Sequence, residues 1–327
     1  MTSVVDVFIR GQLVERRRRL EHAVARHETG AHLHGLLEEV DAALGRIEDG
    51  SYGICESCHD SIESDRLICD PLTRYCIDHL TGPELAALQR DLDLAAQVQR
   101  GLLPPTDLSL HGWRVAYHYE PAGVVSGDYC DVVDGGKSGL YFMVGDVSGK
   151  GIAASMLMSQ LHAMFRTLIS IGLPLQNMVE HASRVFSQST LPAHYATLVC
   201  GRAEPNGRVE VCNAGHLPPL VVADGHVTSL ETSGLPVGMF LNEEFSVDEL
   251  LLLPGHSMVL YSDGVSEAND AAGGEYGCER LRQLIAKQNG GGPVELVSAC
   301  RDDLAAFRAG THRADDVTML VLNRAVA

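Results

Sequence analysis

The chain has 327 residues, of which 45% are apolar and 21% are charged, a composition typical of a globular protein of about two domains. Its formal charge of −18 excludes broad nucleic-acid binding, because phosphate backbones are held by Lys and Arg. No stretch of about 18 apolar residues occurs, and the first charges follow a short apolar patch, the reverse of a signal peptide. We therefore expect a cytoplasmic protein that has no membrane contact.

Residues 1–50 are expected to form short N-terminal helices. The segment from Val4 to Ile47 is rich in Leu, Glu, Arg and Ala, and a break at residues 28–30 divides it in two. The dense basic run Arg16 to Arg19 is expected to be the solvated face of the first helix. These helices are a candidate surface for a homodimer.

The next segment, residues 51–82, contains little material for a hydrophobic core and carries a CxxC pair and a CxxH pair, with seventeen residues between them. This spacing is typical of structural zinc sites, in which four tetrahedral ligands bind the ion and supply folding energy. Cys69 is a competing candidate ligand, but no second ligand lies beside it. The predicted zinc ligands are Cys55, Cys58, Cys76 and His79.

The remaining cysteines are scattered through apolar segments and are expected to be buried thiols in a reducing compartment. They are Cys130, Cys200, Cys212, Cys278 and Cys300.

Residues 83–104 are expected to form a linker helix, which begins near Pro83 and stops at Pro104-Pro105. Its apolar residues recur at helical spacing and fall close to one face. Two interpretations stay open: a plain linker, or a regulatory helix that sets the activity of the C-terminal domain.

Residues 105–327 contain grouped strands and grouped helices, which predicts an α+β domain with largely antiparallel sheets. Helical patterns occupy residues 152–171, 174–189, 277–289 and 293–308. The strand-like segments are VAYHYEP, GLYFMVGD, YATLVCGRAE, RVEVCNAG, SMVLYSDG and VTMLVLN.

Four short motifs in this domain place aspartates at predicted strand ends or in the turns after them. Hard divalent cations such as Mg²⁺ and Mn²⁺ prefer such carboxylate and carbonyl oxygens. Two ions about 3.5–4 Å apart can clamp phosphoryl oxygens and activate a water that attacks in line. One Asp-Gly pair alone is more often a turn, so it is the combination that predicts a two-metal phosphatase site. The aspartates are Asp128, Asp131, Asp146, Asp263, Asp315 and Asp316.

The motifs SGDYCDV, GDVSGKGIAASMLM, NAGHLPP, YSDGVSEA and DDVTMLVL follow one another in order. In this order they resemble the PPM (PP2C-like) serine/threonine phosphatases of the SpoIIE/RsbU type. The resemblance implies an αββα sandwich with a binuclear Mn²⁺ or Mg²⁺ centre at one edge of its two sheets. Asp146 would bridge both ions, the carbonyl of Val147 would complete one shell, and Asp128, Asp263 and Asp315 would be the other ligands.

Four further residues near these motifs are expected to have supporting roles or are left between two roles. Asp316 is expected to support or cap the site, and Asp131 is left between a supporting role and a surface turn. His216 is expected to brace a loop near the active face, although its ordinary pKa also suits acid/base chemistry. Lys150 is expected to steady its turn, with phosphate contact as the alternative.

The stretch SYGICESCHDSIESDRLICDPLTRYCIDH resembles the DksA/TraR zinc finger, with His79 where that family usually has a fourth Cys. For the phosphatase domain, the resemblance implies a phosphoprotein substrate, usually phosphoserine or phosphothreonine on a STAS-domain anti-anti-sigma factor, and hence sigma-factor regulation. Two alternatives remain: a catalytically dead binding module on the same fold, and a zinc-finger regulator that acts on RNA polymerase.

Overall fold

The computed structural model describes residues 4–25, 31–80, 82–190, 194–230, 234–240, 244–288, 291–311 and 313–326. It divides into two compact units, residues 1–91 and 92–327, which are described separately. Helix α4 (Gly82–Leu102) contains the boundary between them. None of the described helices is both long and apolar enough to cross a membrane.

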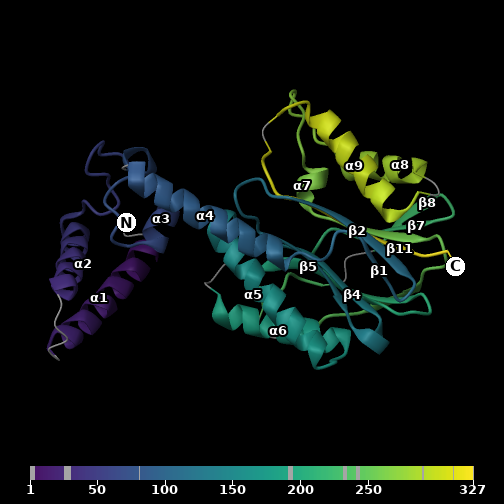
Figure 1. Ribbon diagram of the computed structural model, residues 1–327, viewed down its shortest axis with the longest axis horizontal. Coiled ribbons are helices and arrows are strands. Elements are labelled where there is room, and N and C mark those ends of the chain that lie inside the picture. Colours follow the sequence, from purple (N-terminus) through teal and green to yellow (C-terminus); the bar gives the residue numbers. More distant parts are fainter. Residues whose placement is uncertain are drawn as a thin grey trace. The chain divides into compact units, whose positions relative to one another are not determined.

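The first unit contains a helix pair, α1 (Val4–Ala25) and α2 (Ala31–Asp49) (Figure 1). Two helices were predicted here, but at 22 and 19 residues they are longer than the short helices expected. The predicted break at residues 28–30 lies outside the described residues. After the pair come the short helix α3 (Ser64–Cys69) and a 3₁₀ turn, Ile77–His79. The small core of this unit joins the helix pair to the cysteine-bearing segment and comprises Ile9, Leu13, Val40, Ala43, Cys55, Ile62, Leu67 and Cys76.

The basic run of α1 is solvated, as expected. Arg16 to Arg19 are all exposed. Arg18 and Arg19 pair with Glu15, and Arg17 pairs with Glu21 of its own helix and Asp41 of α2. Exposed pairs of this kind contribute little to stability.

The second unit is built on two sheets in which all pairings between the named strands are antiparallel. The first sheet has the spatial order β1 (Leu108–Leu110), β2 (Trp113–Glu120), β11 (Val317–Arg324), β10 (Ser257–Tyr261), β7 (Leu220–Ala223) and β8 (His226–Ser229). The second has the order β3 (Asp128–Asp134), β4 (Leu140–Val147), β5 (Ala196–Ala203), β6 (Arg208–Ala214) and β9 (Asp248–Leu251).

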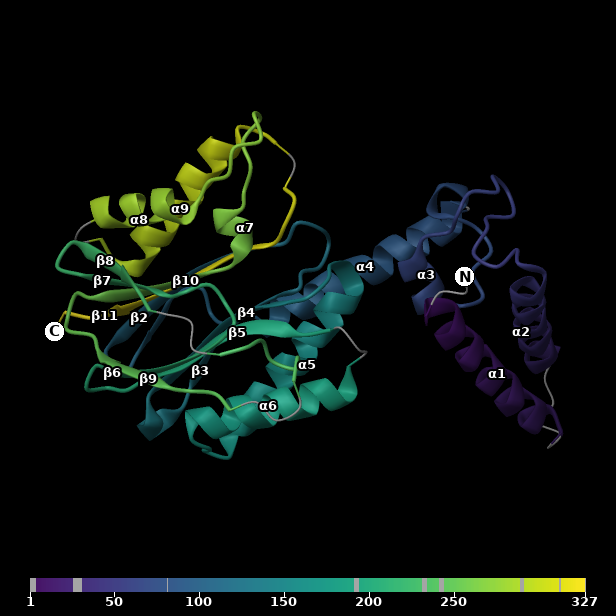
Figure 2. The ribbon, with the colours of Figure 1, turned by 180° about the vertical axis from the view of Figure 1, so that it is seen from behind.

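Helices cover the outer face of each sheet (Figure 2). Helices α5 (Gly151–Ser170) and α6 (Leu175–Ser189) pack on the second sheet, and α8 (Cys278–Lys287) and α9 (Pro293–Arg308) pack on the first. A third core, between the sheets, includes Trp113, Phe142 and Leu320. Because both faces of β4 are covered, seven of its eight residues are buried. The expected αββα sandwich is therefore confirmed.

The structure adds five strands that the sequence did not predict: β1, β3, β7, β8 and β9. Four are short, at three or four residues, and β3 reads DYCDVVD, which looked like a metal-binding turn followed by a few apolar residues. The expectation that all five scattered cysteines are buried is wrong for Cys278, which is exposed at the start of α8, while the other four are buried.

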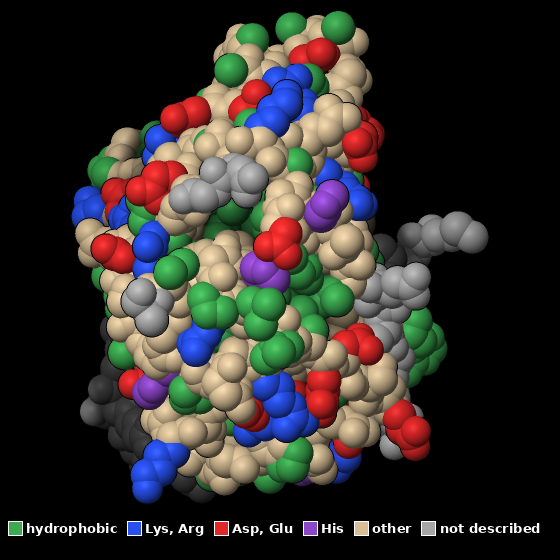
Figure 3. All heavy atoms as spheres, turned by 90° about the vertical axis from the view of Figure 1, so that its right-hand side faces the viewer, with side chains coloured by type: hydrophobic (Ala, Val, Ile, Leu, Met, Phe, Trp, Pro, Cys, Tyr) green, Lys and Arg blue, Asp and Glu red, His purple; other side chains and the backbone are tan. Residues whose placement is uncertain are grey.

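Because its strands are antiparallel, strand ends of the second unit lie at two opposite ends of the sandwich. The face at the end where β11 finishes mixes apolar side chains with charges of both signs, and acidic groups do not gather on it (Figure 3). The aspartate motifs lie at the other end, where β4 and β10 finish and β3 and β11 begin.

Gly201 provides a test of how closely the neighbouring strands β4 and β5 of the second sheet pack. It lies directly opposite Phe142 of β4, and a Cβ at this position would overlap the Phe142 ring. We expect Gly201→Ala to lower the free energy of unfolding by about 1–3 kcal/mol, the usual cost of overpacking. Urea denaturation followed by circular dichroism measures it.

The matched control is Gly101→Ala in the last turn of α4, where a Cβ would meet nothing within 4 Å. It should be neutral or stabilise by up to about 1 kcal/mol. Equal stability of the two variants would contradict this description of the sheet.

Candidate functional site

Asp128 and Asp146 face each other across two neighbouring strands. Asp128 begins β3 and Asp146 is the next-to-last residue of β4, and the register of the ladder pairs them directly. Directly opposed residues of an antiparallel pair have Cβ atoms about 4.5–5.5 Å apart, so the two carboxylates lie on one face of the sheet. Asp128 is almost completely buried.

Asp263 and Asp315 come from the other sheet. Asp263 begins the short helix α7 (Asp263–Ser266) directly after β10, and Asp315 lies two residues before β11. The Ser262 hydroxyl accepts a hydrogen bond from the Thr318 amide at 3.0 Å, and the Ser262 amide donates to the Thr318 carbonyl at 2.9 Å. A Cβ on Gly264 would overlap the Asp316 carbonyl, so this close approach requires glycine.

The electrostatics of the aspartates show that they form one cluster. Burial, followed by the charges of Asp263, Asp315 and Asp316, raises the pKa of Asp146 to about 7. Burial and then the charge of Asp146 raise the pKa of Asp128 well above its ordinary value. The pKa of Asp263 is raised by burial and then by Asp315.

This oxygen-rich set fits hard divalent cations, because a bound cation would remove the mutual repulsion of the carboxylates. The carbonyl oxygen of Val147 adds a neutral donor beside them, since a Cβ on Gly127 would lie 3.1 Å from it and 3.5 Å from Asp146 Oδ1. The structure thus places the five residues of the predicted divalent-metal site at one end of the two sheets. Among the described residues, only the zinc-ligand candidates have ligand atoms that all lie within 4.8 Å of one another.

Thr318 orients Asp128 and was not singled out by sequence reasoning. Its hydroxyl donates a hydrogen bond to Asp128 Oδ2, and the Asp128 amide donates to the Ser126 hydroxyl at 3.0 Å. Thr318 is the last residue of the DDVT motif, so its position three residues after Asp315 was the available signal.

The adjacent residues Asp315 and Asp316 have different partners. Asp316 Oδ1 accepts the Ala122 amide at 2.7 Å and its Oδ2 accepts the Gly127 amide at 2.9 Å, so its carboxylate is used by the backbone. Asp315 Oδ2 instead accepts a hydrogen bond from Lys150 Nζ at 2.9 Å, and the same ammonium donates to the Ala314 carbonyl at 2.8 Å. Lys150 therefore ties its turn to the loop before β11.

Asp131 does not lie in a surface turn, one of the two roles considered for it. It is fully buried within β3 and forms a two-pronged ion pair with Arg166 of α5, at 2.8 Å from Nε and 2.7 Å from Nη2. His162 of α5 lies 3.4 Å from the same carboxylate. Because side chains alternate along a strand, Asp131 points to the opposite face from Asp128 and is not a ligand candidate.

Gln99 connects α4 to the loop before Asp128. Its side chain is buried, and its Nε2 donates to the Ser126 carbonyl at 2.7 Å while its Oε1 accepts the Ser126 amide at 3.0 Å. One amide thus satisfies both backbone groups of Ser126, two residues before a candidate ligand. Sequence reasoning missed Gln99, because a polar residue in a linker helix is usually solvent-facing.

His216 is a brace and not an acid or base. Its Nε2 lies 3.1 Å from the Tyr261 carbonyl, which can only accept, so Nε2 carries the proton and Nδ1 accepts from the Thr197 hydroxyl at 2.8 Å. Burial lowers the pKa of His216 to about 4, so the ring is neutral at pH 7. It joins β5, the loop after β6 and the end of β10, as expected for a loop brace.

The predicted zinc ligands converge in the first unit. The ligand atoms of Cys55, Cys58, Cys76 and His79 all lie within 4.8 Å of one another. Although burial opposes it, backbone hydrogen bonds from Cys58 and Cys76 lower the pKa of Cys55 to about 6, which favours a metal-binding thiolate. The side chain of Cys69 lies outside the described residues.

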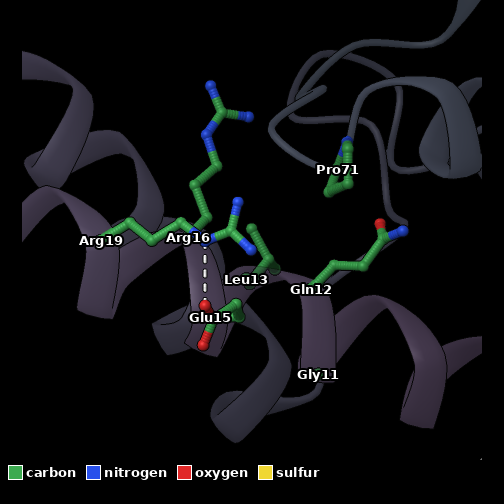
Figure 4. Close-up of a pocket in the computed structure, with 7 residues that line it drawn as sticks. All are labelled: Gly11, Gln12, Leu13, Glu15, Arg16, Arg19 and Pro71. Atoms are coloured by element: carbon green, nitrogen blue, oxygen red, sulfur yellow. Dashed lines mark hydrogen bonds and ion pairs between the residues drawn. The ribbon is translucent and has the colours of Figure 1, made fainter.

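A shallow hollow of the first unit is lined by residues other than the zinc-ligand candidates. Residues of α1 from Gly11 to Arg19 and Pro71 surround it, with the ion pair between Glu15 and Arg19 at its side (Figure 4). The zinc-ligand candidates do not line it, and its two arginines make it unsuited to a metal cation.

Two antiparallel sheets packed face to face, helices outside each, and aspartates gathered at one edge define a PP2C-like phosphatase domain. The SiaA-PP2C domain of Pseudomonas aeruginosa shares this fold, with a TM-score of 0.65 at 19% identity over 74% of this chain and 99% of that one. The family described as Stage II sporulation protein E (SpoIIE) matches residues 136–325. The chain belongs to the SpoIIE family.

Curated relatives match across most of the chain. Protein IcfG of Synechocystis sp. is 27% identical over 263 residues, which are 72% of this chain and 41% of IcfG. Phosphoserine phosphatase RsbU of Bacillus subtilis is 27% identical over 244 residues, 73% of this chain and 71% of RsbU. The chain thus spans about two-fifths of IcfG. The prokaryotic dksA/traR C4-type zinc finger matches residues 50–78.

The Gln99 clamp gives a prediction about the metal site. Gln99→Leu leaves the Ser126 amide and carbonyl buried without partners, so the loop before Asp128 should loosen. We expect phosphatase activity to fall about 10- to 100-fold, the range for residues that hold metal ligands in place. Turnover of p-nitrophenyl phosphate across a Mn²⁺ titration measures it.

The matched control is Gln97→Leu, an exposed glutamine of the same helix, which should keep full activity. If both variants behaved alike, the clamp would have no role in the site.

The His216 brace predicts a pH dependence of stability. The folded pKa of about 4 lies below the unfolded value near 6.5, so protons bind preferentially to the unfolded chain as pH falls. The brace therefore contributes fully above pH 6.5 and loses up to about 3 kcal/mol between pH 6.5 and 4. Urea unfolding of the wild type and His216→Gln over this range measures the difference, in which the shared carboxylates largely cancel. A constant difference would refute a neutral, buried His216.

Proposed function

We propose that this chain is an active metal-dependent protein serine/threonine phosphatase. The observation that carries the proposal is the convergence of Asp128, Asp146, Asp263 and Asp315, from both sheets, into one cluster whose charges repel one another. A catalytically dead module on this fold would normally have lost one or more of these carboxylates. The relative named phosphoserine phosphatase RsbU supports the same reaction.

In this proposal Asp146, the Val147 carbonyl, Asp128, Asp263 and Asp315 would hold two Mn²⁺ or Mg²⁺ ions. When bound, the ions supply a nucleophilic water and offset the charge of the phosphoryl group. Thr318 holds Asp128 toward the cluster, and Asp316 fixes the loops that carry Gly127 and Ala122. Lys150 offsets part of the negative charge at Asp315.

The proposed substrate is a phosphoserine or phosphothreonine on a partner protein, with a STAS-domain anti-anti-sigma factor as the particular candidate. The resemblance to SpoIIE/RsbU-type phosphatases supports this choice, and through it a role in sigma-factor regulation. A regulator acting on RNA polymerase is less favoured, since the zinc-finger match covers only residues 50–78.

We further propose that the first unit binds one structural zinc ion through Cys55, Cys58, Cys76 and His79, with His79 replacing the last cysteine of the C4 type. Such a site would stabilise a unit whose core is small. A homodimer through α1 and α2 and a cytoplasmic location belong to the same proposal.

Asp146→Asn tests the metal site directly. We expect Mn²⁺-dependent hydrolysis of p-nitrophenyl phosphate to fall more than about a hundredfold, because a bridging ligand should matter more than the residues that orient it. Since Asn carries no charge, the metal-free variant should melt at a higher temperature than the metal-free wild type. The rise in melting temperature on adding Mn²⁺ should shrink.

The control is Asp302→Asn on the exposed side of α9, which should keep activity and metal response. Activity that survives Asp146→Asn, or that ignores a chelator, would refute the assignment.

Cys76→Ser tests the zinc site. The purified wild type should contain one zinc ion per chain, whereas this variant should contain much less and its first unit should become sensitive to protease. The exposed Cys278→Ser provides a matched control that should retain zinc. Metal analysis by mass spectrometry is decisive, and zinc-free wild-type protein would contradict the assignment.

A further inference from the structure

A pocket of about 380 Å³ adjoins the aspartate cluster on one side. Asp146 and Asp263 form the wall that it shares with the cluster. Its volume lies at the small end of the range for ligand pockets, so it suits one or two side chains better than a whole ligand. The other lining residues are Ser148, Tyr195, Thr197, Gly215, His216, Leu217, Pro218 and Glu267.

The walls of this pocket are held firmly. The Ser148 amide donates to the Tyr195 carbonyl at 2.9 Å, and the Tyr195 amide donates to the Ser148 hydroxyl at 3.0 Å. Leu217 and Pro218 follow directly on the His216 brace. The pocket is therefore built on the same supports as the candidate ligands, so it should keep its shape when substrate arrives.

Two polar groups of the lining are unused by the protein. Glu267 is exposed, and its carboxylate forms no ion pair with any described residue. The Tyr195 hydroxyl likewise makes no hydrogen bond to a described residue, although its backbone is tied at two points. By contrast, the Thr197 hydroxyl is engaged by His216. Glu267 and Tyr195 are thus free to bind a ligand.

We propose that this pocket is a specificity subsite that receives a basic side chain next to the phosphorylated residue of the substrate. The aliphatic part of a Lys or Arg would pack on Leu217 and Pro218, and its charged end would meet Glu267 and Tyr195. This inference rests on the proposed phosphatase function, because the pocket adjoins Asp146 and Asp263.

The lining disfavours other occupants. An acidic side chain would be repelled by Glu267. An apolar side chain would cover that carboxylate without offering it a partner, which costs free energy. A long cationic side chain satisfies both the apolar wall and the carboxylate, as lysine and arginine do elsewhere when their stems pack on apolar surface.

Synthetic phosphoserine peptides test the subsite. The set carries a single Arg at one position from two residues before to two residues after the phosphoserine, and each peptide has a partner with Gln in its place. With the full chain and Mn²⁺, we expect Arg at one position to raise kcat/KM about threefold to fivefold over Gln, the size of a partly exposed ion pair. Glu267→Gln should remove this preference, whereas Glu279→Gln on α8 should retain it.

The outcomes separate the subsite from the underlying function. Equal rates for Arg and Gln at every position would overturn the subsite, as would hydrolysis of p-nitrophenyl phosphate without hydrolysis of any peptide. A Glu267→Gln variant that slows both members of a pair equally would show a structural role and would also overturn it. Failure of the wild type on every phosphate ester would refute the phosphatase function itself.

Discussion

Repulsion among carboxylates at the shared edge of the two sheets is the constraint on which the rest of the second unit depends. Asp128 and Asp146 are directly paired across β3 and β4, and Asp263 and Asp315 arrive from the other sheet. Placing such groups together opposes folding, as the raised pKa values of Asp128, Asp146 and Asp263 indicate. The four-layer αββα frame must therefore hold them in place until cations relieve the repulsion.

The frame holds the aspartates in place with hydrogen bonds, most of which connect segments distant in sequence. Gln99 holds the loop before β3, Thr318 orients Asp128, and His216 joins β5 to the end of β10. Each brace ends on backbone or on a ligand candidate and leaves the cluster itself open to ions. One of these braces, His216, also lines the pocket beside the aspartate cluster, so the shape of that pocket is linked to the position of the end of β10.

Much of this could be predicted from the sequence, for identifiable reasons. Long apolar strands such as LYFMV and the spaced helical patterns carry their own periodicity, so an α+β domain with largely antiparallel sheets could be predicted, whereas the αββα layering followed from the resemblance to SpoIIE/RsbU-type phosphatases. The aspartates stood beside glycines at segment ends, which marked the candidate ligands. The zinc ligands were evident from spacing, because a pair two residues apart can chelate from one turn.

Other features depended on three-dimensional pairing, which leaves no local pattern. The roles of Gln99 and Thr318 arise from partners 27 and 190 residues away. Strands β7, β8 and β9 have only four residues each and exist because neighbours complete their ladders. Asp131 resembled its neighbour Asp128 by residue type, and only the alternation of β3 separates a buried partner of Arg166 from a ligand candidate.

The two faces of β3 have a mechanical consequence. Within four residues, this strand carries Asp128 toward the aspartate cluster and Asp131 toward Arg166 of α5. An extended backbone is stiff over so short a distance, and the fully buried carboxylate of Asp131 accepts two hydrogen bonds from Arg166. A displacement of α5 is therefore transmitted to Asp128 more readily than it is absorbed. The position of α5 and the position of Asp128 are therefore coupled through β3.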